Sequence, residues 1–172
     1  MKKLLLCFLV SASIVACTNP AAKETTSADE KSSTVEHIFK PTYADNWKIG
    51  DQKNVLLAEQ FHQAMFAKDY KQLGDLLVDT VSFNMEDGST IKGKVAVLDF
   101  VQKNFAQLTF KNFKINAIFP TVGDNGHQWV DIWDEADVET PDGKTQKFIW
   151  MDAFRFENGK IVGFIGFVKS PK

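Results

Sequence analysis

Apolar residues recur at helical spacing in three stretches of the chain. The first stretch begins near Val55, with Asp51 or Asn54 as its N-cap, and it carries Phe61 and Met65 on one face. Residues three or four positions apart lie on the same side of an α-helix. We therefore predict a helix whose apolar side faces the protein interior.

Two shorter helices are predicted further along the chain. Asp69 is a suitable N-cap for a helix that carries Leu73 on its apolar face. Gly93 precedes a third helix, in which Val97 and Val101 share one side. Leu98 and Phe105 extend the apolar face of the third helix.

From residue 113 onward, apolar side chains alternate with polar ones, as is typical of strands. This alternation predicts strands at 113–119, 129–138, 148–156 and 161–168, in addition to a short strand at 81–85. Short turns join the last strands, so they are expected to form an antiparallel meander. Helices followed by such a meander predict an α+β fold in which about three helices cover one face of the sheet.

The turn Pro141–Gly143 predicts which side chains share a face of the sheet. A type I turn followed by a left-handed glycine pairs Thr140 with Lys144, and this register places Ile132 opposite Asp152. A shift by one residue would exchange the two faces. We expect the even-numbered face to be concave and covered by the helices; it contains Val130, Ile132, Ala136, Val138, Phe148, Trp150 and Phe154.

The N-terminus has the pattern of an export signal. Two lysines are followed by the apolar run Leu4–Val15, which is too short to span a bilayer as a helix. The run ends in Ile14–Cys17, which resembles the lipobox of bacterial lipoproteins. The resemblance implies cleavage before Cys17 and lipid attachment to its sulfur. Cys7 would leave with the signal, so no disulfide is expected in the mature chain.

The segment after Cys17 is polar and lacks apolar periodicity, which predicts a flexible tether. The expected organisation is a signal peptide at 1–16, the lipidated cysteine and tether at 17–43, and one folded domain at 44–172. The lipid anchor would hold the protein on a membrane of the bacterial cell envelope, with the domain in the periplasm or at the cell surface.

Composition narrows the function. The chain has 20 Lys+Arg and 22 Asp+Glu among 172 residues. A formal charge of −2 argues against nucleic acid as a partner, because a basic surface is needed to neutralise phosphates. Fifteen phenylalanines predict a large apolar interior or an apolar pocket.

Two segments resemble the NTF2-like superfamily, in its SnoaL-like branch. They are Trp150–Ile161, in the last predicted strand pair, and Phe66–Val81, which follows the first helix. The resemblance extends over about residues 55–169. It implies a cone in which a curved sheet wraps around the helices and leaves a pocket at its open end. It also implies dimers formed through the outer face of the sheet.

Within this superfamily, Asp152–Phe156 is similar to a run in bacterial ketosteroid isomerases that contains a buried aspartic acid donor. The same resemblance places Phe61 where those enzymes have a tyrosine donor and Met85 where they have a carboxylate base. Neither side chain donates to an oxyanion or accepts a proton from carbon. These two replacements favour a binding role over enolate chemistry.

We expect a pocket that binds a small apolar ligand, with Asp152 as its polar anchor. The structural alternative is a hydrogen bond between Asp152 and a neighbouring backbone group, an indole or Arg155, with the indole or Arg155 as donor. His62 is expected at the rim facing water; its pairing with Asp152, as in a SnoaL-like acid–base enzyme, is the alternative. The predicted lining consists of Phe61, Met65, Phe83, Met85, Ile132, Trp150, Phe154 and Phe164.

The sequence predicts no cofactor and no metal site. His127 could be combined with Asp131 or Asp134, but residues four apart on a strand are roughly 13 Å apart, which is too far to share an ion. The acidic run 131–139 is interpreted as a solvated strand.

The odd-numbered face of the sheet is expected to be convex and open. Trp129, Trp133 and Met151 would then form an exposed apolar patch. A homodimer interface is the simplest interpretation of this patch. Stacking of a sugar or peptide, or a role as a protein-interaction module, is the alternative.

Overall fold

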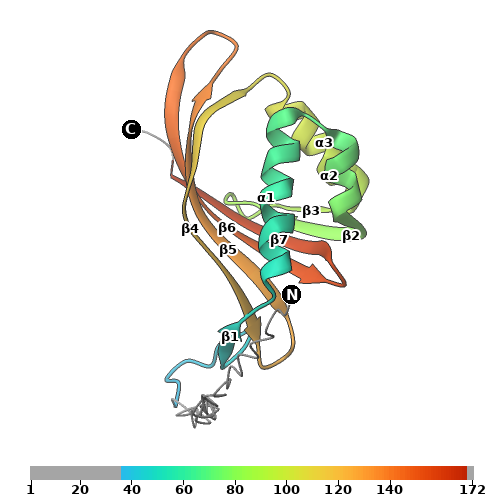
Figure 1. Cartoon of the computed structure of the whole chain (residues 1–172), viewed down its shortest axis with the longest axis vertical. Coiled ribbons are helices and arrows are strands. Elements are labelled where there is room, and N and C mark those ends of the chain that lie inside the picture. Colours follow the sequence, from blue (N-terminus) through green and yellow to red (C-terminus); the bar gives the residue numbers. More distant parts are fainter. Residues whose placement is uncertain (1–35, 170–172) are drawn as a thin grey trace, which may run out of the picture. The chain divides into compact units, whose positions relative to one another are not determined.

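A curved sheet packs against three helices in residues 36–169, the part of the chain that the computed structural model describes (Figure 1). The predictions for the signal peptide, for Cys17 and for most of the tether fall outside the described residues. Among the helices of residues 36–169, none is long and apolar enough to cross a membrane.

The first helix is α1 (Gln52–Ala67), and its ends have clear local causes. The Asp51 side chain accepts a hydrogen bond from the Lys53 backbone N–H, which caps the first turn. Lys68 adopts a left-handed conformation with φ 59° and ends the helix. Of the two predicted N-caps, Asp51 is therefore confirmed, and Asn54 lies inside the helix.

The other two helices also begin where the sequence predicted. In α2 (Tyr70–Leu76), the Asp69 side chain accepts from the Gln72 backbone N–H. Gly93 precedes α3 (Lys94–Phe105) with φ 91°, a conformation that side chains disfavour.

The sheet has seven strands within residues 36–169, in the order β1-β4-β5-β6-β7-β2-β3. All neighbours pair antiparallel except β2 and β7, which run parallel. The short strands β1 and β3 and this parallel pair were not predicted. The strands are β1 (Trp47–Ile49), β2 (Leu77–Asn84), β3 (Thr90–Lys92), β4 (Thr109–Gly123), β5 (Gln128–Glu139), β6 (Thr145–Glu157) and β7 (Lys160–Lys169).

The predicted register of β5 and β6 is confirmed. The Thr140 backbone N–H donates to the Lys144 carbonyl at 2.9 Å, and Ile132 lies opposite Asp152. Gly143 has φ 80°, as the turn requires. The even-numbered residues of both strands consequently face the helices.

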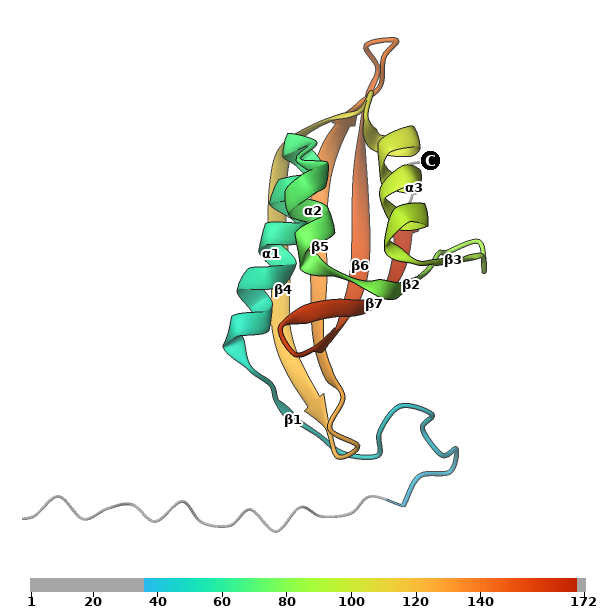
Figure 2. The same ribbon diagram turned by 90° about the vertical axis from the view of Figure 1, so that its right-hand side faces the viewer.

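All three helices lie on one face of the sheet (Figure 2): α1 packs against β4 and β5, whereas α2 and α3 pack against β2. The hairpin of β5 and β6 extends past the helices at one end. Buried side chains from the helices and from the concave face form one core cluster, which includes Phe61, Leu73, Ile132 and Phe154.

One residue of the predicted exposed patch on the outer face of the sheet, Trp129, is in fact buried. Trp133 and Met151 are exposed, at 46% and 52%, but Trp129 is only 7% exposed. The ring of Tyr43 lies 5.3 Å from that of Trp129 and covers it. The segment before β1 is remote in sequence, so the strand pattern alone could not reveal this cover.

Candidate functional site

A cavity of about 320 Å³ lies between the helices and the concave face of the sheet. Aromatic side chains make up much of its lining, including several from α3 and β4 that the sequence did not single out. The residues of the predicted lining that do line it are Phe61, Met65, Phe83, Met85, Trp150 and Phe164.

The placement of Ile132 and Phe154 in the lining was wrong. Both side chains are 0% exposed and belong to the core rather than to the cavity wall. The Phe154 ring lies 5.1 Å from Phe61 and 5.0 Å from Phe164, so it supports two wall residues from behind. Their shared face of the sheet was predicted correctly, but the depth at which they are packed was not.

His62 is not at the rim, contrary to the preferred prediction. Its side chain is buried because α1 turns a broad face to the sheet, and this face includes Ala58, Phe61 and His62. Nδ1–H donates to the Ala58 carbonyl at 3.1 Å, one turn earlier in the helix. Nε2 is directed to the other side, toward the sheet.

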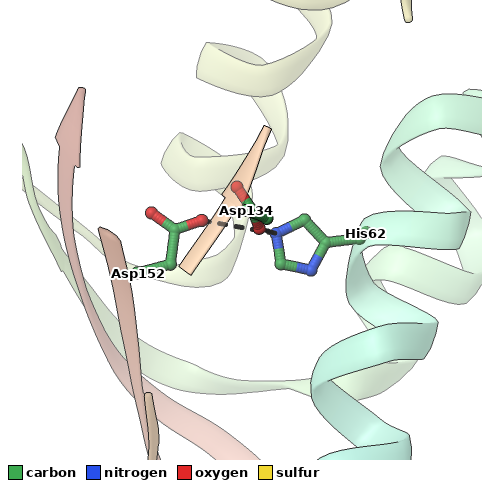
Figure 3. Close-up of side chains that lie close together, drawn as sticks. All are labelled: His62, Asp134 and Asp152. Atoms are coloured by element: carbon green, nitrogen blue, oxygen red, sulfur yellow. Dashed lines mark hydrogen bonds and ion pairs between the residues drawn. The ribbon is translucent and has the colours of Figure 1, made fainter. Parts of the chain in front are cut away.

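Two carboxylates meet His62 Nε2, as Figure 3 shows. Oδ2 of Asp152 lies 3.3 Å from this nitrogen, and Oδ2 of Asp134 lies 3.4 Å from it. The alternative pairing of His62 with Asp152 is therefore confirmed. Arg155 was another predicted partner of Asp152. Its Nη2 atom instead lies 3.7 Å from Oε1 of Glu157.

Sequence reasoning missed Asp134, which is only 1% exposed. The predicted register already placed position 134 on the even-numbered, inward face, directly opposite Trp150. Its membership in an acidic run suggested solvent exposure instead. The alternation of the strand was the better signal, since Glu135 and Asp137 on the other face are less buried.

The pKa values of this cluster are shifted by burial and by mutual charge. Burial raises the pKa of Asp134 to about 7, helped by the nearby charge of Asp152 and opposed by that of His62. Burial would lower the pKa of His62, but the hydrogen bond and charge of Asp152, the charge of Asp134 and the Ala58 carbonyl outweigh it. The net effect raises the pKa of His62 above 6.5.

Asp134 is also poorly satisfied. Neither of its carboxylate oxygens has a hydrogen-bond partner among the described residues, and its contact with His62 lacks hydrogen-bond geometry. A buried carboxylate without donors is costly, by several kcal/mol in order of magnitude. The cavity floor therefore contains an acceptor that a bound group could satisfy.

This polar cluster adjoins apolar walls. The Phe113 ring stacks on the His62 imidazole at 5.4 Å and an interplanar angle of 29°. Within residues 36–169, His62, Asp134 and Asp152 also form a group whose ligand atoms lie within 4.8 Å of one another, close enough to hold one metal ion. Chemically, the cluster can exchange a proton, accept hydrogen bonds or coordinate a cation.

Gly166 allows the Phe164 ring, which lines the cavity, to lie close to the cluster of His62, Asp134 and Asp152. A Cβ atom at position 166 would lie 2.7 Å from the Phe164 ring and 3.2 Å from Oδ1 of Asp152. The absence of a side chain on β7 thus allows Phe164 to lie across its own strand.

Comparison with known proteins supports the fold. A family model described as a SnoaL-like domain matches residues 58–164. A search of the curated proteins finds no match.

Solved structures also resemble the chain. They include a ketosteroid isomerase-like protein from Erwinia carotovora atroseptica, with TM-score 0.56, 14% identity and coverage of 68% of this chain and 94% of that one. An LEH-like epoxide hydrolase from M. tuberculosis has TM-score 0.54, 16% identity and coverage of 68% and 83%. An NTF2-like protein from Burkholderia xenovorans has TM-score 0.53, 17% identity and coverage of 71% and 93%. At these identities the likeness concerns the fold, and it confirms the predicted NTF2-like α+β cone.

Proposed function

The chain belongs to the SnoaL-like domain family, and we propose that its pocket binds a small, mainly apolar molecule without transforming it. The observation that carries this proposal is the cavity of about 320 Å³, whose walls are aromatic and whose floor has two carboxylates. Ligand pockets commonly have this size and this combination of apolar walls with a few polar groups.

The floor indicates what the ligand should carry. Asp134 has two buried oxygens that find no donor within residues 36–169, and Asp152 lies beside it. A ligand with one hydroxyl, amine or other N–H group would supply a donor to these acceptors. The rest of the molecule would contact rings such as Phe61, Phe83 and Phe164.

Two features bear on catalysis. Phe61 and Met85, which stand where the ketosteroid isomerase resemblance expects polar groups, both line the cavity. This supports a binding role. The distance of 3.3 Å between His62 and Asp152 favours acid–base catalysis as the second candidate, because the pair could pass a proton to a bound molecule.

N-phenyl-1-naphthylamine, an apolar dye with one N–H donor, should bind the purified full chain and become brighter. Met65→Trp should weaken this binding at least about tenfold, because the larger side chain fills the cavity. Lys53→Trp, on the exposed first turn of the same helix, should leave the binding unchanged. Fluorescence titration measures the affinity, and thermal unfolding checks that both variants fold.

Equal dye binding by the wild type and the Met65→Trp variant would contradict a binding role for the cavity. Turnover of a polycyclic or polyketide-like ketone by the wild type, abolished in Asp152→Asn and His62→Gln, would replace that role with acid–base catalysis.

We also propose that Cys17 anchors the protein to the bacterial envelope. The support is the short apolar run that ends in Ile14–Cys17. In a bacterial host, Cys17→Ser should move the protein from the membrane fraction to the soluble fraction, because the acylated sulfur is lost. Cys7→Ser should not. Immunoblots of the two fractions measure this, and a membrane-bound Cys17→Ser protein would contradict the anchor.

The proposed homodimer would form through the outer face of the sheet. Trp133 lies opposite Met151, and Met151 lies opposite Phe167, so these exposed side chains are continuous across β5, β6 and β7. The Phe119 ring extends the patch, 6.2 Å from Trp133. A patch of this kind favours burial against a second copy.

Trp133→Ala should raise the dimer dissociation constant at least about tenfold, since central aromatic residues dominate such interfaces. Leu56→Ala, which removes an exposed apolar side chain of α1 on the other side of the sheet, serves as the control. Analytical ultracentrifugation measures both. An assembly state unchanged by Trp133→Ala means that this face is not the contact.

A further inference from the structure

The three polar side chains at the cavity floor direct their ligand atoms toward a common point (Figure 3). We propose that His62, Asp134 and Asp152 bind a divalent transition-metal ion with tetrahedral preference, of the Zn²⁺ type. This site goes beyond ligand binding by the apolar walls, and it departs from the expectation that the chain has no metal site.

The distances suit a tetrahedral ion. Nε2 of His62 lies 3.3 Å from Oδ2 of Asp152 and 3.4 Å from Oδ2 of Asp134. Zinc binds imidazole nitrogen and carboxylate oxygen at about 2.0–2.2 Å. With bonds of that length, both nitrogen–oxygen separations correspond to angles at the metal of roughly 110°, which is close to tetrahedral.

The orientation of the imidazole provides the second argument. Nδ1–H donates to the Ala58 carbonyl, so the neutral ring carries its lone pair on Nε2. Metal-binding histidines typically hold the other ring nitrogen in this way, which fixes the tautomer and the ring orientation. A lone pair directed at two carboxylates is repelled by them unless a cation or a proton lies between.

Asp134 provides an independent observation. Its side chain is 1% exposed, and both oxygens lack hydrogen-bond partners among the described residues. A divalent cation would coordinate one of these oxygens directly. It would also balance the two negative charges of Asp134 and Asp152, whose burial in an apolar cavity is otherwise unfavourable.

The donor set narrows the type of metal. One nitrogen and two carboxylate oxygens suit Zn²⁺ and Co²⁺, whereas Mg²⁺ and Ca²⁺ prefer six or more oxygen ligands. Three protein ligands leave a fourth position, and all three line the cavity together with Phe113 and Trp150. A water molecule or the polar group of a pocket ligand could complete the coordination there.

The test is titration of the purified full chain, without a polyhistidine tag, with Co²⁺. A tetrahedral site should give the strong visible d–d absorption of four-coordinate cobalt at one equivalent, and Zn²⁺ should displace it. Asp134→Asn, Asp152→Asn and His62→Gln should each lower Co²⁺ affinity at least about 100-fold, since loss of outer-shell partners already costs about 10–100-fold.

Asp131→Asn is the matched control, because Asp131 lies on the same strand but on the opposite face. It should retain wild-type Co²⁺ binding. Thermal unfolding provides the second measurement: Zn²⁺ should raise the Tm of the wild type and of Asp131→Asn, but not that of the three site variants. The melting transition without metal shows whether each variant is folded.

Absence of a one-equivalent Co²⁺ or Zn²⁺ complex in the wild type would overturn the metal site and assign the position between the three groups to a proton. Equal affinity in folded Asp134→Asn would overturn it as well. Neither result affects binding of the naphthylamine dye by the apolar walls, so failure of the metal site is distinguishable from failure of the proposed pocket.

Discussion

Two carboxylates and one imidazole are buried together in an otherwise apolar interior, and this cluster constrains the rest of the structure. Asp134 and Asp152 come from neighbouring strands, and His62 comes from α1. Burial of two carboxylates is tolerated only where an opposing charge or a donor lies within reach. The position of α1 over the concave face is thus coupled electrostatically, as well as by packing, to the register of β5 and β6.

The strand pairing that brings the two carboxylates together could be predicted from the sequence, whereas the rotation of α1 could not. The turn Pro141–Gly143 fixes the pairing of β5 and β6, and strand alternation then determines the inward side chains, including Asp134 and Asp152. Strand alternation also identified four residues of the cavity wall, Phe83, Met85, Trp150 and Phe164, but the wall residues from α3 and β4 were missed. The rotation of α1 was harder to predict, since each residue turns the helix by about 100° and His62 lies at the edge of the apolar stripe.

The features that could not be predicted depend on contacts between distant segments. The parallel pairing of β2 with β7 joins strands separated by four others in sequence. Tyr43 covers Trp129 from a segment without regular spacing. Phe154 and Ile132 share a face with the wall residues but are covered by core packing. Local periodicity indicates which face a side chain is on, whereas the distance from the cavity depends on the whole fold.

The central claim is that Asp134 is held in the buried cluster, and the pH dependence of stability tests it most directly. Burial raises its pKa from 3.8 to about 7, so this contribution to stability is complete below about pH 4 and is lost as pH rises to about 7. The pKa of His62 is also raised, so the contribution of His62 to stability is lost as the pH rises above 6.5.

Urea denaturation in buffer containing a chelator should show the wild-type free energy of unfolding falling between about pH 4 and about pH 7, on the order of 1–3 kcal/mol more than that of Asp134→Asn. Parallel pH profiles for the two proteins would contradict the buried position of Asp134 in the cluster.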